Sequence, residues 1–193
     1  MKYLWNPQLS DSEVHLIGTI FVQWGALEYE IFMQTLKTFE RAEGDTDIPV
    51  LPKEMNNLQF SGVLDLWNER VARTRRGKRG EVLQQQCEEI KKLKEVRDAL
   101  THGMWHWTPE DLGEIRTVRV KKRDVITSHF SADFLGGVAC RVGEINFKIR
   151  FPGGLVDLAN QQMEDGGYMS RRAVAMFSGA PVDLDGYPTA HPE

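Results

Sequence analysis

Residues 10–36 of the chain read SDSEVHLIGTIFVQWGALEYEIFMQTL, and this stretch decides the fold. It opens with Ser10 and, three residues later, Glu13, a capping-box pattern that marks the first turn of a helix. Apolar side chains then recur at helical spacing and are interrupted only at Glu28, which predicts one long amphipathic helix. They are Val14, Ile17, Phe21, Trp24 and Ile31. We expect this helix to run to about Glu43 and to end at Gly44.

Two more helices are predicted in the middle of the chain. The first is marked by Phe60, Val63, Leu64, Trp67 and Val71 and should stop near Gly77 and Gly80. The next covers residues 81–101 and should end at Gly103, a residue type common after the last helical turn. A shorter helix is expected over residues 155–163.

The period of the apolar pattern changes after Gly103. Residues 104–107, 115–120 and 146–151 alternate as short strands do, whereas residues 124–142 fit either a strand or a helix that opens near His129. The expected fold is therefore mainly α, a helical bundle with a small appended β-hairpin or sheet at about residues 104–151, and α+β overall. We expect one domain over residues 1–177 and a loose tail over 178–193.

Composition excludes several classes of protein. The 193 residues are 41% hydrophobic and 27% charged, which is typical of a folded globular chain and not of a disordered one. No apolar stretch is long enough to span a membrane, and residues 1–13 lack the pattern of a secretory signal, so a cytoplasmic location is expected. Cys87 and Cys140 are then reduced thiols. No phosphate-loop, serine-hydrolase or zinc-protease motif occurs, and neither a metal nor a cofactor is expected.

Charge is unevenly distributed along the chain. Residues 1–69 carry 4 basic and 11 acidic side chains, whereas residues 70–123 carry 15 basic and 8 acidic ones, although the net charge is −4. A dense basic run favours binding to phosphate backbones, as in RNA. It contains Arg70, Arg73, Arg75, Arg76, Lys78 and Arg79. A solvated helix end of no function is an equally good interpretation of this run.

An arginine interrupts the apolar stripe of the third predicted helix. On a helical wheel Arg97 falls between Ile90 and Leu100. A guanidinium keeps its charge, so this position needs a carboxylate, a bound anion or an opening to solvent. Glu28, which interrupts the stripe of the first helix, is a candidate partner. A purely structural Arg–Glu pair between the helices is the competing interpretation.

Residues 95–103, Glu-Val-Arg-Asp-Ala-Leu-Thr-His-Gly, place His102 five positions after Arg97 at the end of the same helix. With Gly103 and the aromatic Trp105, this pattern resembles the Arg-x4-6-His signature of the HEPN superfamily. The first helix, with Trp24-Gly25-Ala26-Leu27-Glu28, also resembles the opening helix of uncharacterised bacterial members. The resemblance covers residues 10–107.

The resemblance implies a helical homodimer in which both copies contribute Arg97 and His102 to one cleft for metal-independent RNA cleavage. The chemistry agrees, because a histidine can move the proton of a ribose 2′-hydroxyl while an arginine stabilises the phosphate. Five residues turn a helix by about 140°, so the two side chains do not share a face. Either the helix unwinds at residues 101–103 or a second copy completes the site. Gly18 and Gly25 share a face on which another helix could approach.

The other candidate site residues are less specific. Asp98 stands where many nucleases of this superfamily have Asn, which places a negative charge beside the proposed phosphate position. His102 is also suited to a simple helix C-terminal cap. His106 is a second candidate for proton transfer and Trp105 for base stacking, although structural roles are the commoner explanation for both.

We therefore expect an RNA-binding HEPN-like homodimer and a metal-independent ribonuclease of a toxin or defence type, with an antitoxin or a nucleotidyltransferase as partner. The alternative is a non-catalytic helical dimer that binds a nucleotide or a protein partner in the same pocket. Neither function requires a membrane.

Overall fold

The capping box at Ser10 starts the longest helix, α1 (Asp11–Lys37), as predicted. The Ser10 hydroxyl accepts a hydrogen bond from the backbone N–H of Glu13 at 3.2 Å, and the Glu13 carboxylate accepts one from the backbone N–H of Ser10 at 2.7 Å. This computed structural model describes residues 9–39, 51–106 and 114–165.

The predicted end of the first helix near Gly44 is wrong, because α1 ends at Lys37. The hydroxyl of Thr38 donates a hydrogen bond to the Thr35 carbonyl at 2.6 Å, and Arg70 donates one to the Thr38 carbonyl at 2.9 Å. Side chains thus satisfy carbonyl groups that a further helical turn would otherwise have bonded.

The second predicted helix is divided into two parts. After the short 3-10 helix η1 (Lys53–Met55), α2 (Phe60–Trp67) continues directly into the π-helical turn η2 (Asn68–Ala72). In this turn the N–H of Arg73 donates to the carbonyl of Asn68, five residues earlier, at 2.9 Å. The helical segment therefore ends at Ala72 and not near Gly77.

The third helix, α3 (Gly77–His102), starts four residues before the predicted position at Glu81 and ends where predicted. Gly80 permits the early start: a Cβ there would lie 2.0 Å from the carbonyl oxygen of Arg75. The role of Gly103 differs from the prediction, because its φ of −75° is open to any residue. A Cβ at Gly103 would instead lie 2.5 Å from the Cβ of Thr117, so the glycine permits a close approach to the sheet.

The sheet that follows α3 has three antiparallel strands in the order β1 (Met104–His106), β2 (Ile115–Lys121) and β3 (Asp124–Phe130). Strands near residues 104 and 115 were predicted and are confirmed. The pairing places Trp105 opposite Thr117 and Val120 opposite Val125. Trp107 and the connection to β2 lie outside the described residues.

The predicted strand at residues 146–151 is wrong, because this segment lies in α4 (Ala132–Arg150) and its cap. The β element therefore ends at Phe130 and not at 151, and Ser131 caps α4 by accepting a hydrogen bond from the N–H of Phe134. The six-residue alternation is part of a longer helical stripe of buried side chains. These are Leu135, Val138, Ala139, Val142, Ile145 and Ile149. α5 (Leu155–Glu164) follows, near its predicted position, and the tail at 178–193 lies outside the described residues.

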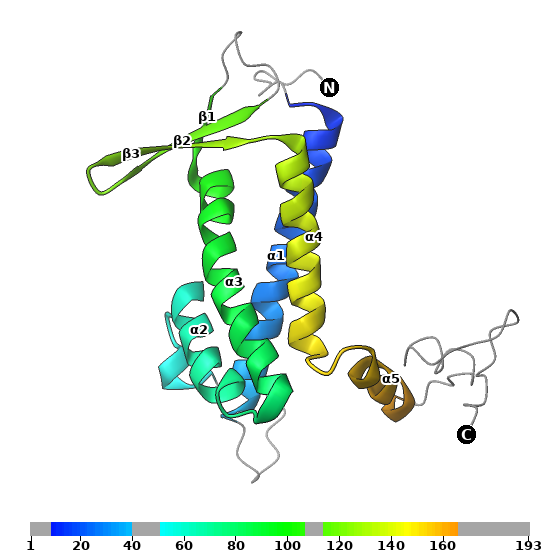
Figure 1. Cartoon of the computed structure of the whole chain (residues 1–193). Helices are drawn as coiled ribbons and strands as arrows, with labels where there is room; N and C mark the ends of the chain where they lie inside the picture. Colours follow the sequence, from blue (N-terminus) through cyan, green and yellow to red (C-terminus); the bar gives the residue numbers. More distant parts are fainter. Residues whose placement is uncertain (1–8, 40–50, 107–113, 166–193) are drawn as a thin grey trace, which may run out of the picture.

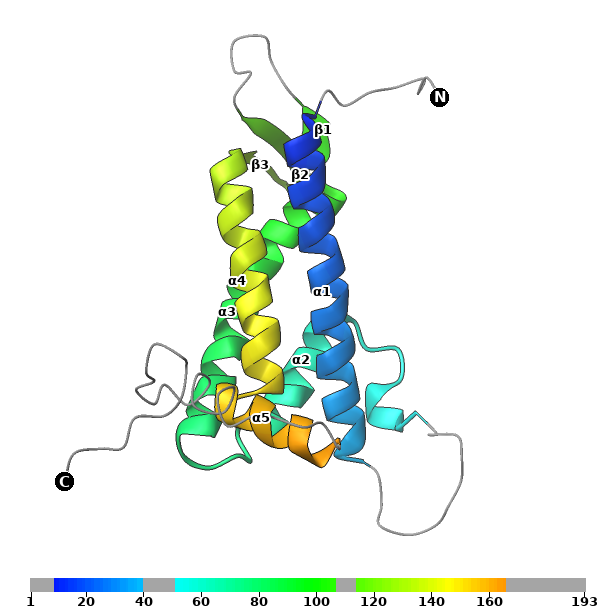
Figure 2. The ribbon, with the colours of Figure 1, turned by 90° about the vertical axis from the view of Figure 1, so that its right-hand side faces the viewer.

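The helices form a bundle with the sheet across one end (Figure 1). α1 and α4 lie side by side, and α5 lies across the end of the bundle opposite the sheet (Figure 2). The core between the helices is apolar, and its largest fully buried side chains are Trp67, Ile20, Leu27, Ile31, Leu64, Leu83 and Ile90. The predicted fold class, mainly α with a small sheet and α+β overall, is confirmed. Within the described residues, no helix is long and apolar enough to cross a membrane.

Candidate functional site at the end of α3

Arg97 contacts Glu28, as its position in the apolar stripe predicted. Its side chain spans from α3 to α1, where one terminal nitrogen donates to Glu28 Oε1 at 3.2 Å. The same carboxylate oxygen accepts a hydrogen bond from the Trp24 indole at 2.7 Å, and the guanidinium lies 5.9 Å from the centre of the Trp24 ring. The Arg97 side chain remains 26% exposed. The pair therefore lies at the edge of the core and is accessible to solvent.

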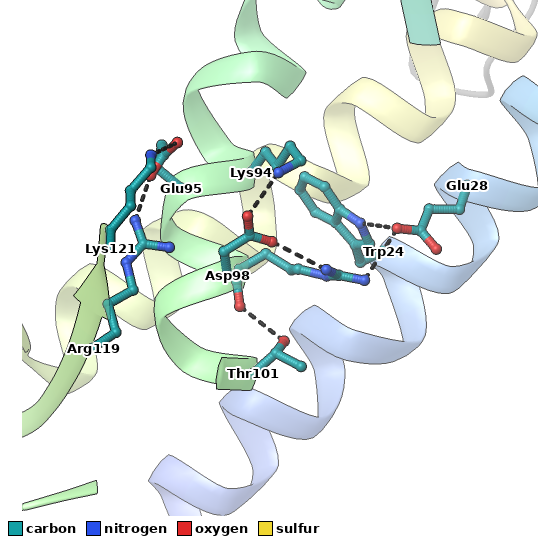
Figure 3. Close-up of polar contacts among 9 residues, drawn as sticks. Trp24, Glu28, Lys94, Glu95, Asp98, Thr101, Arg119 and Lys121 are labelled. Carbon is teal, nitrogen blue, oxygen red and sulfur yellow. Dashed lines mark hydrogen bonds and ion pairs between the residues drawn. The ribbon is translucent and has the colours of Figure 1, made fainter. Parts of the chain in front are cut away.

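Asp98 forms ion pairs with two cations, Lys94 and Arg97 itself. It accepts a hydrogen bond from Lys94 at 2.7 Å and one from Arg97 at 3.1 Å. Burial opposes ionisation of the Asp98 carboxyl, but these hydrogen bonds outweigh burial and hold its pKa below the ordinary value. The negative charge of Asp98, which stands where the resembled signature often has Asn, is thus paired with two cations. Figure 3 shows these contacts, which run from Lys94 to Asp98 and from Asp98 through the guanidinium of Arg97 to Glu28.

His102 lies on a different side of α3. The helix is continuous through His102, so it does not unwind at residues 101–103 to bring this side chain toward Arg97. His102 is exposed and lines a groove of about 440 Å³ between the end of α3 and strand β2. Asp98 also lines this groove and contacts Arg97, so it connects the two halves of the candidate site.

Two cations of β2 that were not among the sequence candidates line the same groove. Arg119 pairs with Glu95 of α3, and Lys121 pairs with the same carboxylate at 3.3 Å (Figure 3). These hydrogen bonds hold the pKa of Glu95 below its ordinary value. Lys94 also lines the groove. His102 therefore lines a groove together with three cationic side chains, Lys94, Arg119 and Lys121.

The alternation of residues 115–121 contained a signal for these two cations. Ile115, Thr117, Arg119 and Lys121 share one face of β2, and the first two are buried against the bundle. The next two positions on that face must therefore reach the end of α3. What the sequence could not provide was the direction in which the strands fold back over the helix.

Trp105 and His106, the remaining candidates near the sheet, both belong to β1. Trp105 is partly buried and packs against the apolar core. His106 belongs to β1, where it pairs in register with Arg116. Trp105 does not line the groove beside His102, and the side chain of His106 lies outside the part of the chain that the structure describes.

The basic run does not form a single free surface. Arg70 donates to the Thr38 hydroxyl at 2.7 Å and lies 3.7 Å from the centre of the Phe39 ring, and Arg79 pairs with Asp157 of α5. Within the described ranges the other four side chains make no hydrogen bond or ion pair. They are Arg73, Arg75, Arg76 and Lys78, and all four are exposed.

Groups of three or more His, Cys, Asp or Glu side chains placed to hold a metal ion are absent from residues 9–39, 51–106 and 114–165. Comparisons of the chain with protein-family models, with curated protein sequences and with solved structures found no match.

Proposed function

We propose that this chain is a HEPN-type protein that binds RNA and cleaves it without a metal. The observation that carries the proposal is the position of His102, exposed at the end of a continuous helix beside a groove with Lys94, Arg119 and Lys121. A phosphodiester in that groove would have a proton acceptor within the same cluster as three phosphate-binding cations. The three cations also compensate the two carboxylates of the groove, Glu95 and Asp98.

The reaction follows from the chemistry of the side chains. Neutral His102 removes the proton of a ribose 2′-hydroxyl, whose oxygen attacks the adjacent phosphorus. The bond from phosphorus to the 5′-oxygen of the next nucleotide breaks, that oxygen takes up a proton from water, and His102 returns to the solvent the proton that it removed. The products are a 2′,3′-cyclic phosphate and a 5′-hydroxyl. The cations stabilise the charge that builds on the phosphate oxygens in the transition state.

The proposal includes a homodimer. Within residues 9–39, 51–106 and 114–165, nothing covers α1 at Gly18 and Gly25, because a Cβ at either glycine would meet no atom within 4 Å. Phe21 and Tyr29 of α1 are exposed on the same helix. A groove of about 360 Å³ between α1 and α2 includes both Gly25 and Glu28, the partner of Arg97. A second copy packed on this face would lie beside Arg97, which His102 of the same chain does not reach.

A non-catalytic dimer that binds a nucleotide or a protein partner is the second candidate. It is favoured by the two ion pairs of Arg97, with Glu28 at 3.2 Å and with Asp98 at 3.1 Å. An arginine that is paired in this way stabilises the contact between the two helices and binds a phosphate more weakly than an unpaired arginine would. Under either function we infer a cytoplasmic protein, and for the nuclease a toxin or defence role with an antitoxin or nucleotidyltransferase as partner.

Replacement of His102 separates the two functions. His102 is exposed and its side chain makes no hydrogen bond within the described residues, so His102→Ala should fold normally. We expect it to abolish cleavage of single-stranded RNA that is insensitive to EDTA and leaves 2′,3′-cyclic phosphate ends. His15→Ala is the matched control, since His15 is also an exposed helical histidine but does not line the groove. Wild-type protein that binds RNA without cutting it would favour the binding module, whereas His102→Ala that cuts at the wild-type rate would refute the proposed role of His102.

A further inference from the structure

A second polar cavity lies at the opposite end of the bundle from the sheet. This polar cleft has a volume of about 740 Å³ and is lined by residues of α1, η2, α4 and α5, and of the connection that leads into α3. Four of its side chains are cationic: Lys37, Arg70, Arg75 and Arg150. α5, which contributes Gln161, lies across this end of the molecule (Figure 2).

Local structure holds two of these cations in fixed positions. Arg70 is on the π-helical turn and is fixed by its hydrogen bonds to Thr38 and by the ring of Phe39. Arg150, in the last turn of α4, donates to Glu30 at 3.0 Å. Both are therefore held in place before any ligand arrives, which lowers the entropy lost on binding.

A hydrogen-bonded network supports the lining of the cleft. Glu30 accepts a hydrogen bond from Gln34 at 2.9 Å, and Gln34 accepts one from the buried Trp67 indole at 2.9 Å. Gln34 also donates to the Ile149 carbonyl at 3.2 Å, which ties α1 to α4. The side of the cleft formed by α1 and α4 is thus anchored in the core of the bundle.

The charge of the polar cleft is not balanced by its own residues. Among the described residues that line the cleft, Glu30 is the one carboxylate, which leaves an excess of three positive charges on these residues in a chain whose net charge is −4. Lys37 and Arg75 make no hydrogen bond or ion pair within the parts of the chain that the structure describes. Their positions are therefore available to a ligand of opposite charge.

We propose that the polar cleft binds two consecutive phosphate groups of one ligand. A terminal pyrophosphate group carries about −3 at neutral pH and matches the excess of three positive charges more closely than a single phosphate monoester at about −2, whereas two phosphodiesters of an RNA chain carry about −2 together. Arginines and lysines from four different segments surround the ligand, and arginine favours bidentate contacts with phosphate oxygens. The volume falls within the range of small-ligand sites. The two phosphates belong either to a small molecule with a pyrophosphate group or to an RNA chain.

The test compares two double variants that remove the same charge. Lys37→Gln with Arg75→Gln removes two cations from the cleft, whereas Lys53→Gln with Arg123→Gln removes an exposed lysine and an exposed arginine that lie outside both the cleft and the basic run. None of the four side chains has a bonding partner within the described residues, so both variants should fold, which circular dichroism and thermal unfolding check. Binding is measured by calorimetry at low salt with inorganic pyrophosphate and with 2′-O-methyl RNA, which the proposed nuclease cannot cleave.

We expect pyrophosphate to bind the wild type and to bind the cleft variant about tenfold or more weakly, with the control variant within about threefold of wild type. That result supports a small-molecule source. If pyrophosphate fails to bind but the cleft variant loses more affinity for 2′-O-methyl RNA than the control does, the phosphates belong to a chain. The proposal is overturned if neither probe binds, or if both variants lose affinity equally. If both variants lose affinity equally, the cleft proposal fails alone; if the wild type binds no RNA, the proposed RNA binding fails with it.

Discussion

Replacement of Glu28 by Gln tests what Arg97 does in the folded chain. The substitution keeps the size of the side chain, and its amide oxygen can still accept the hydrogen bond from the Trp24 indole. It removes the charge that Arg97 faces across the α1–α3 boundary at 3.2 Å. Arg97 is left with Asp98, which Lys94 already occupies on its other oxygen.

The expected loss of stability follows from the burial of the pair. The side chains of Arg97 and Glu28 are 26% and 33% exposed, so the pair lies between a surface ion pair, which contributes up to about 1 kcal/mol, and a buried one, whose disruption costs about 3–5 kcal/mol. We expect Glu28→Gln to lower the free energy of unfolding by about 1–2 kcal/mol. For a chain of this length that corresponds to a fall in Tm of about 3–6 °C.

The assay is urea denaturation of four proteins: wild type, Glu28→Gln, Arg97→Met and the double variant. Their double-mutant cycle should give a coupling energy of about 1 kcal/mol. Glu144→Gln is the control, because Glu144 is 55% exposed and its contacts with Arg141 and Lys148 lie within α4 at 3.7 and 3.8 Å. It should change stability by less than about 0.5 kcal/mol.

The same variant should strengthen RNA binding if Arg97 belongs to the proposed site. Removing a carboxylate beside Arg97 removes a competitor for the guanidinium and a charge that repels phosphate. Stability and affinity therefore change in opposite directions. A coupling energy near zero would refute the structural role of the pair, and unchanged or weaker RNA binding would refute the participation of Arg97 in that site.

Three further predictions follow from individual contacts. Gly103→Ala should lower stability by about 1–3 kcal/mol in urea denaturation, because its Cβ would lie 2.3 Å from the Ala99 carbonyl oxygen and 2.5 Å from the Thr117 Cβ; an unchanged midpoint would contradict this account. Burial of the Asp98 carboxyl acts to raise its pKa, but the hydrogen bonds from Lys94 and Arg97 lower it further than burial raises it. The ionised carboxylate therefore contributes stability above the unfolded pKa of about 4, and this contribution is lost as the pH falls through the lower folded pKa. Asp98→Asn should therefore make denaturant midpoints less dependent on pH below about 4, and an acid dependence equal to that of wild type would count against it. Burial raises the pKa of the Cys87 thiol whereas Cys140 is exposed, so a thiol reagent should label one cysteine rapidly, and Cys140→Ser should remove that rapid reaction.

Local signals in the sequence located the helices α1, α2 and α3, although not α4. The Ser10–Glu13 capping box and the apolar stripe that follows it both lie within one segment, so they can be recognised without knowledge of distant contacts. The pairing of Arg97 with Glu28 was also predictable, because each charge interrupts an otherwise apolar stripe and burial requires a partner. Such conflicts between charge and burial are informative without a structure.

Other features depended on contacts between distant segments. α1 ends six residues before the predicted position because Arg70, from η2, bonds to Thr38. Residues 146–151 alternate as a strand does, yet the longer stripe from Leu135 to Ile149 packs them as a helix against α1. The groove beside His102 depends on β2 folding back to α3, which no local pattern specifies. Sequence reasoning therefore found the histidine but not the cations around it.

The different surroundings of Arg97 and His102 determine how each can be tested. Arg97 bonds to Glu28 and Asp98, so its replacement disturbs the contact between α1 and α3 as well as any phosphate site. A loss of activity in an Arg97 variant would combine the two effects. His102 is exposed and its side chain has no bonding partner in the described segments, so its replacement changes the chemistry of the groove with little effect on packing. Since a rigid helix separates the two side chains by about 140°, any RNA phosphate that contacts both must be held between two copies of the chain. An active nuclease that remained a monomer would therefore have to work with His102 and the cations of β2, without Arg97.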